Sequence, residues 1–227
     1  MKDNLELKII AKIKTDFPTK FGIPRQSGII DNEALIVFEE EYRNEQALKG
    51  IEGFSHIWLI WKFSETETDS FKPTVRPPRL GGNKRMGVFA TRSPFRPNPI
   101  GLSSVKLLGV EKTKEGLALR VSGADLMNNT PILDIKPYLP FTDCHPDASG
   151  GFAEEQINKN LQVVLSDELA QRIPNEKLEI LKTVLSQDPR PHYIEDSDRV
   201  FGFNFMNYEI KFKVDNDTLT VTDITNL

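Results

Sequence analysis

Short apolar runs, separated by long polar or proline-rich segments, characterise the first 140 residues of this chain. The runs occupy residues 7–13, 34–38, 54–63, 102–110, 117–121 and 132–136. Runs of this length that are rich in β-branched and aromatic side chains are typical of strands rather than helices. Because almost no helical periodicity lies between them, they predict an antiparallel β-barrel or closed sheet.

The pattern changes after residue 140. Residues 141–156 are rich in Asp, Ser, Gly and Pro, which is typical of a linker. Beyond it the sequence predicts two capped helices and three alternating strands, at residues 166–172, 175–187, 200–206, 208–214 and 218–224. We therefore predict a mainly β protein, with an antiparallel β-barrel domain over residues 1–145 and a small α+β domain over residues 146–227.

Within the first domain, the sequence GVFATRSPFRPNPIGL (residues 87–102) separates two apolar runs and contains three prolines and two arginines. Proline fixes φ and lacks a backbone donor, so neither a helix nor an interior strand can pass through residues 93–99. A stiff loop that presents Arg92 and Arg96 is suited to bind an anion. The alternative is a plain connection between strands whose arginines face water.

Charge is distributed unevenly along the chain. The formal net charge of -4 argues by itself against a polyanionic partner. Residues 70–110, however, contain no Asp or Glu, and their basic residues are Lys72, Arg76, Arg79, Lys84, Arg85, Arg92, Arg96 and Lys106. Such a basic block predicts a surface that binds phosphates or RNA, with a solvated basic loop as the alternative.

The sequence also excludes several classes of protein. No apolar run approaches the roughly 20 residues of a membrane-spanning helix, and no secretory signal follows Met1. The three histidines lack the spacing of zinc ligands, and the single cysteine, Cys144, cannot form an internal disulfide. The motifs of a P-loop, a Rossmann dinucleotide site and a Gly-x-Ser-x-Gly nucleophile are missing. We therefore expect a cytoplasmic protein that binds neither a metal nor a membrane.

Three longer motifs occur in a fixed order along the chain. They are RPPRLGG from Arg76, GVFATRSPFRPNPIG from Gly87 and DIKPYLP from Asp134, and they are preceded by Pro24–Gln26 and Phe54–His56. Together they resemble the TsaA-like (TrmO) family over the whole chain, most densely over residues 20–140. The resemblance implies a homodimeric β-barrel methyltransferase that uses S-adenosylmethionine. Its implied substrate is tRNA, in which it methylates N6 of the threonylcarbamoyl-modified adenosine 3′ of the anticodon, at position 37.

The resemblance also implies where the cofactor binds. A fixed guanidinium such as that of Arg92 would pair with the cofactor's carboxylate in a charge-assisted hydrogen bond. The implied contacts are Pro24, Arg25, Gln26, Ser64, Glu65, Arg92, Leu102, Leu126, Met127, Asn128 and Asn129. Many relatives carry histidine where this chain has Ser64, so the side-chain contact at that position differs here.

Methyl transfer to an amine needs the reacting atoms in line and a nearby acceptor for the amine proton. We interpret Asp134 as that acceptor and Tyr138 as a group that stacks on or bonds to the base, whereas Lys136 shares the strand face of Asp134. These three are the predicted catalytic residues, and ordinary core and rim positions are the alternative for each. The predicted RNA contacts are Arg76, Arg79, Lys84, Arg85, Arg96 and Arg190.

Two other functions are alternatives to the methyltransferase. A non-catalytic RNA- or nucleotide-binding barrel would keep the fold but would not need Arg92, Asp134 and Tyr138 together. A hydrolase that used Ser93 or Ser103 as its nucleophile lacks a suitably placed base. The sequence therefore favours the methyltransferase.

Overall fold

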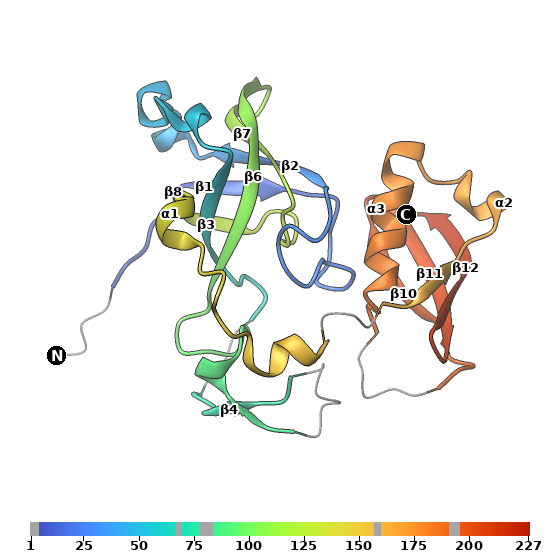
Figure 1. Cartoon of the computed structure of the whole chain (residues 1–227). Coiled ribbons are helices and arrows are strands. Elements are labelled where there is room, and N and C mark those ends of the chain that lie inside the picture. The colour runs from blue at the N-terminus through green and yellow to red at the C-terminus, as the bar shows by residue number, and fades with distance from the viewer. Residues whose placement is uncertain (1–4, 67–69, 78–83, 157–159, 191–195) are drawn as a thin grey trace.

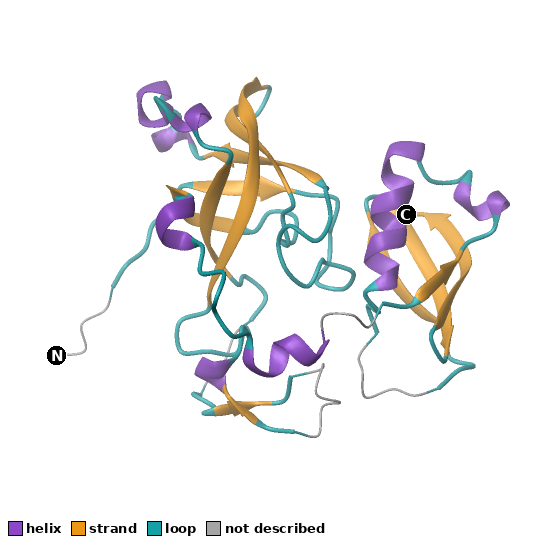
Figure 2. Ribbon diagram, viewed as in Figure 1, coloured by secondary structure: helices purple, strands orange, loops and turns teal. Residues whose placement is uncertain are grey.

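The computed structural model describes residues 5–66, 70–77, 84–156, 160–190 and 196–227. Strands dominate these residues and helices are few and short, as Figure 2 shows. Antiparallel pairing joins all the paired strands except β9 and β12, which run parallel. The mainly β, antiparallel class predicted from the sequence is therefore confirmed.

Six strands of the N-terminal part close into a barrel in the order β1-β2-β7-β6-β3-β8 (Figure 1). Their bounds are Ala11–Lys14 (β1), Glu33–Phe38 (β2), His56–Lys62 (β3), Ile100–Thr113 (β6), Gly116–Ser122 (β7) and Pro131–Pro137 (β8). In β3, Ile57, Leu59 and Trp61 are buried, whereas Trp58 and Ile60 between them are only partly buried. The two tryptophans therefore lie on opposite faces, as their opposite parity predicts.

Short elements occupy the connections around the barrel. They are η1 (Glu40–Tyr42), η2 (Glu45–Leu48), η3 (Ile51–Gly53), β4 (Thr74–Val75), β5 (Met86–Gly87), η5 (Val88–Ala90), α1 (Pro140–Asp143) and η6 (Gly151–Gln156). β4 and β5 form a separate two-stranded ribbon. Two of these elements, α1 and η6, lie at the segment predicted to be a linker, which is therefore partly helical. Local turns of this kind leave little periodicity in a sequence rich in Gly and Asp.

The C-terminal part is mostly sheet. Four strands pair in the order β10-β11-β12-β9, and helix α3 contributes Leu181 and Leu185 to the core beneath them. The bounds are Gln162–Val164 (β9), Asp167–Ala170 (α2), Asn175–Ser186 (α3), Phe201–Phe205 (β10), Tyr208–Asp215 (β11) and Thr218–Asn226 (β12). The predicted hairpin between β11 and β12 is present, with Asn216 in the left-handed region at φ 51°. Within the described residues, no helix is both long and apolar enough to cross a bilayer.

The N-terminal loop that follows β1 packs into the C-terminal core. Phe17 is fully buried there, with its ring centroid 6.0 Å from that of Phe205, and Ile30 of the same loop joins the same cluster. The side chains of Asp16 and Lys177 form an ion pair 2.5 Å long across the same contact. A segment of the first domain in sequence therefore completes the core of the second.

Phe17→Ala is expected to lower the free energy of unfolding by about 3–5 kcal/mol, because the surrounding core relaxes only partly into the cavity that the substitution leaves. Urea denaturation followed by tyrosine and tryptophan fluorescence measures this loss. Phe21→Ala is the matched control, because Phe21 belongs to the same loop but is half exposed. An equal loss in the two variants would contradict a buried, core-forming role for Phe17.

Candidate functional site

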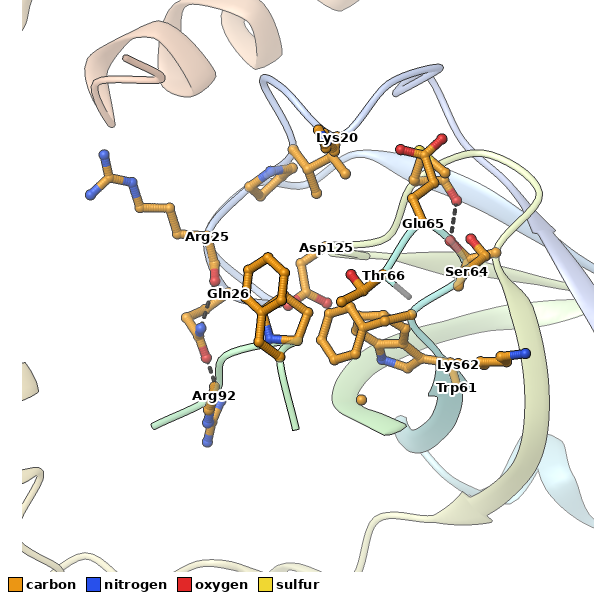
Figure 3. A pocket seen from close by; sticks show the side chains of 18 of the residues that line it. Lys20, Arg25, Gln26, Trp61, Lys62, Ser64, Glu65, Thr66, Arg92 and Asp125 are labelled. Carbon is orange, nitrogen blue, oxygen red and sulfur yellow. Dashed lines mark hydrogen bonds between the residues drawn. The ribbon is translucent and has the colours of Figure 1, made fainter. Parts of the chain in front are cut away.

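A cavity of about 930 Å³ lies beside the barrel, where it meets the C-terminal part. Its size suits a cofactor or a small-molecule ligand. Its charged lining consists of six cations, Lys20, Arg25, Lys62, Arg92, Arg96 and Arg190, and two carboxylates, Glu65 and Asp125. Figure 3 shows several of these residues around the cavity, on separate loops and strands. Both negative and positive groups of one ligand can therefore be bound there.

Hydrogen bonds fix the loop that carries Arg25 and Gln26. The Arg25 guanidinium donates to the carbonyl oxygen of Asp188 over 2.5 Å, just after the end of α3. The Gln26 side chain accepts a hydrogen bond from Nη1 of Arg92, as the dashed line in Figure 3 shows. The anion-binding loop predicted around Arg92 is therefore joined to a loop far from it in sequence.

Asp125 lies inside this cavity and was not among the residues predicted from the sequence. Its Oδ1 accepts a hydrogen bond from Ser103 Oγ over 2.6 Å, and Ser103 Oγ accepts one from Trp61 Nε1 over 3.0 Å. Burial raises the pKa of the Asp125 carboxyl, and the bond from Ser103 and the nearby Arg92 guanidinium oppose that rise. The available signal was an acidic residue inside an apolar stretch, immediately before the predicted contact at Leu126.

Gly101 allows the Trp61 indole to lie against the cavity wall. A Cβ atom at this position would collide with the indole ring, whose atoms occupy that space. This glycine at the start of β6 is therefore required by close packing, and Trp61 can reach Ser103 because of it.

The structure brings together eight of the predicted cofactor contacts. They line the cavity and are Pro24, Arg25, Gln26, Ser64, Glu65, Arg92, Leu102 and Met127. Leu126 is buried in the barrel core instead. Asn128 and Asn129 are not among the lining residues, and their side chains accept hydrogen bonds from Thr15 N and Lys14 Nζ, respectively. The turn at 126–129 thus contributes Met127 to the cavity and fixes the chain near β1 through its asparagines.

The predicted catalytic residues lie on the outer face of the barrel. Asp134 and Lys136 project from β8 to the same face, and their side chains form an ion pair 2.8 Å long. The shared face predicted from their parity is confirmed. Tyr138 follows β8, and its ring packs 5.5 Å from Trp58 and 6.2 Å from His56, measured between centroids.

Strand register relates this outer face to the cavity. Leu102 of β6 and Asp134 of β8 both pair with Ile60 of β3, so the three residues form one row across the sheet. Neighbouring strands are about 4.8 Å apart, so about 10 Å separates the backbones of Leu102 and Asp134. Because Leu102 lines the cavity, the face that carries Asp134 begins at the cavity's edge.

Asp143 braces the segment after β8. Its Oδ2 accepts hydrogen bonds from Leu139 N over 2.9 Å and from Trp58 Nε1 over 2.8 Å. The bond from the Leu139 backbone, with that from Trp58, lowers the pKa of the Asp143 carboxyl. These bonds tie the chain just after Tyr138 to Trp58, the residue whose ring packs against Tyr138, a role of Asp143 that was not predicted from the sequence.

The predicted RNA contacts fall into two groups. Arg76, Lys84 and Arg85 are exposed near the β4–β5 ribbon, whereas Arg79 lies outside the described residues. Arg96 and Arg190 instead line the cavity. Nη1 of Arg96 donates to the Thr91 carbonyl over 3.1 Å, and Arg190 forms a two-pronged pair with Asp188 at 2.8 and 2.9 Å. The second group is therefore already engaged in shaping the cavity.

Comparison with known families gives two matches in sequence order. The model described as the tRNA-methyltransferase O N-terminal domain matches residues 12–144, and the TrmO C-terminal domain matches residues 158–227.

In the part of the chain that the structure describes, no group of three or more His, Cys, Asp or Glu residues could hold a metal ion.

Individual relatives agree with these matches. The tRNA (adenine(37)-N6)-methyltransferase of Escherichia coli K12 is 38% identical over 221 residues, which cover 93% of this chain and 94% of that protein. A probable S-adenosyl-L-methionine-binding protein of Pyrococcus abyssi is 38% identical over 151 residues, covering 66% of this chain and 77% of that protein. A crystal structure of TrmO from Pseudomonas aeruginosa superposes with a TM-score of 0.79 at 30% identity, covering 100% of this chain and 99% of that one.

Proposed function

The chain belongs to the tRNA-methyltransferase O (TrmO) family, and on this premise we propose how its cavity and outer face divide the reaction. It is an S-adenosylmethionine-dependent methyltransferase that acts on N6 of adenosine 37 in tRNA. The observation that carries the proposed division is the row Leu102, Ile60 and Asp134, which joins the cofactor-sized cavity to a carboxylate on the adjacent face.

The cavity suits S-adenosylmethionine in size and in charge. When bound, this cofactor supplies an activated methyl group on a cationic sulfonium, together with a carboxylate and an ammonium group. Arg92, braced by Gln26, would bind the carboxylate, and Asp125 would balance the cofactor's positive charge. Without Asp125, the charged lining would hold six cations and one carboxylate around a cationic ligand.

On the outer face, Asp134 would accept the proton that N6 loses as the methyl group is transferred. The adenine amine is a weak nucleophile, because its lone pair is delocalised into the ring and the carbamoyl group. The ion pair with Lys136 would hold the Asp134 carboxylate, and Tyr138 would stack on or bond to the base. The threonylcarbamoyl-modified adenosine is the proposed substrate.

We further propose a homodimer in which the partner subunit covers the apolar edge of the cavity at Ile100 and Leu102. Leu102 and Ile100 are 55% and 37% exposed beside the cavity, and apolar side chains in such a position are typical of an interface. Sedimentation equilibrium tests the dimer, and a single monomeric species at working concentrations would contradict it.

In the same scheme residues 1–145 form the catalytic domain and residues 146–227 help to hold the tRNA. A cytoplasmic location follows from the tRNA substrate.

Incubation with S-adenosylmethionine and tRNA from a strain that lacks this activity tests the reaction. Mass spectrometry of the nucleosides is expected to show one added methyl group on the threonylcarbamoyl-adenosine. Absence of any methyl gain would contradict the function and favour a non-catalytic binding protein. A gain on unmodified adenosine alone would refute the proposed substrate.

A further inference from the structure

Two phenylalanines stack on the surface beside the β4–β5 ribbon. Phe71 is 57% exposed and Phe89 is 74% exposed, and their rings lie nearly parallel, with centroids 6.3 Å apart and an interplanar angle of 25°. Large aromatic side chains are usually buried, and a group of them at the surface marks an interaction site. Neither residue has a role in the cavity or in the row that contains Asp134.

The backbone under this pair is well fixed. Val88, which precedes Phe89, is buried, and its amide donates to the Pro73 carbonyl over 3.0 Å. The register Thr74 with Gly87 joins the same two segments in the ribbon. Because this backbone is already ordered before any partner arrives, binding does not have to pay the conformational entropy of ordering it.

The charge around the pair favours a polyanion. Lys72, Arg76, Lys84 and Arg85 are exposed in the same segments, and residues 70–110 contain no Asp or Glu. Within the described residues, no ion pair involves these four cations. Self-association through this surface about a two-fold axis would bring like charges together, which is unfavourable. A partner that carries both flat apolar groups and negative charge fits instead.

We propose that Phe71 and Phe89 form a stacking platform for an unpaired base of an RNA loop. Single-stranded RNA is typically bound by aromatic side chains that stack on splayed bases and by cations that bind the adjacent phosphates. Phe89 lies just before Thr91 and Arg92, which line the cavity, so the stacked base belongs to the same loop as the acceptor adenosine. This inference rests on the proposed tRNA substrate and adds a base contact to it.

The test uses the full-length protein and a labelled anticodon stem-loop RNA, with affinity measured by fluorescence anisotropy. Phe71→Ala and Phe89→Ala are each expected to weaken binding at least about fivefold, because stacking is worth that much per base. Phe71→Tyr and Phe89→Tyr, which keep the ring, are expected to bind like the wild type. S-adenosylmethionine affinity serves as the control for an intact cavity and is expected to stay unchanged.

Salt dependence separates stacking from charge. The alanine variants of the phenylalanines are expected to keep the wild-type slope of log affinity against log salt concentration. Lys84→Ala or Arg85→Ala is expected to reduce that slope by about 0.7 for each phosphate that the variant no longer neutralises. A changed slope in the phenylalanine variants would overturn the stacking role.

Abasic substitution identifies the stacked base. Each loop nucleotide is replaced in turn by an abasic one, and the wild type is expected to bind more weakly when the stacked base is the one removed. The double variant Phe71→Ala, Phe89→Ala is expected to bind that abasic RNA as well as it binds the intact RNA. The proposed stacking platform would be contradicted if the double variant bound the RNA as tightly as the wild type does. It would also be contradicted if a changed oligomeric state fully explained a weaker RNA affinity of the double variant. If the wild type neither binds nor methylates RNA, the proposed function fails; if it does both while the double variant is unaffected, only the platform fails.

Discussion

Replacing Asp134 with asparagine is expected to lower kcat for methyl transfer by about 10²–10⁴-fold, the usual contribution of a positioned proton acceptor. The amide keeps the size of the side chain but cannot take the proton from N6. Affinity for S-adenosylmethionine is expected to stay the same, because Asp134 lies outside the cavity lining. Single-turnover methylation and cofactor titration measure the two quantities separately.

Glu39→Gln is the matched control for this variant. Glu39 also forms a partly exposed ion pair on the barrel, 3.1 Å from Lys12 Nζ, at 41% side-chain exposure against 46% for Asp134. Its removal is expected to leave kcat unchanged. Unchanged turnover in Asp134→Asn would remove this carboxylate as the acceptor.

Asp125→Asn is expected to weaken S-adenosylmethionine binding by roughly 10- to 100-fold, the range for losing a charged partner in a partly buried site. The asparagine can still accept the hydrogen bond from Ser103, so the wall around Trp61 is kept. Isothermal titration measures the affinity and thermal unfolding measures the stability. A structural role would lower both together, whereas a role in binding a cation lowers the affinity alone.

The pH dependence gives a second measurement for Asp125. Because burial raises the pKa of this carboxyl, the folded protein binds its proton more readily than the unfolded chain does. The contribution to stability is therefore present at low pH and is lost as the pH rises through the raised pKa, a loss that Asp125→Asn lacks. The affinity of the wild type for the cofactor is expected to change with pH in the opposite direction. It falls as the pH is lowered, because protonation removes the negative charge of Asp125. A variant with the same pH profile as the wild type would contradict this assignment.

Local patterns in the sequence were sufficient to predict features that lie within a single strand or hairpin. Alternation alone placed Trp58 and Trp61 on opposite faces of β3 and placed Asp134 beside Lys136. The strands of the barrel and the final hairpin follow from the same periodicity and from turn residues. These features depend on neighbours a few residues apart, which a single sequence contains.

Contacts between distant segments could not be predicted in this way. An apolar residue in a loop, such as Phe17, is expected to be buried, but the sequence around it does not show which of the two hydrophobic cores it joins. The pair Arg190 and Asp188 and the position of Asp125 likewise depend on how separate loops meet around one cavity. The cofactor contacts were predicted from family resemblance, because no local pattern identifies a site assembled from so many segments.

The packing of Phe17 against Phe205 also sets an order of events during synthesis. The two residues are about 190 positions apart, so on a ribosome that adds about 5–20 residues per second the loop waits roughly 10–40 seconds for its partner. The same loop carries Arg25 and Gln26, and Arg25 is anchored to Asp188. The cavity proposed for the methyl donor is therefore completed late in synthesis, after residues 188–190 and the sheet that packs against this loop have been made.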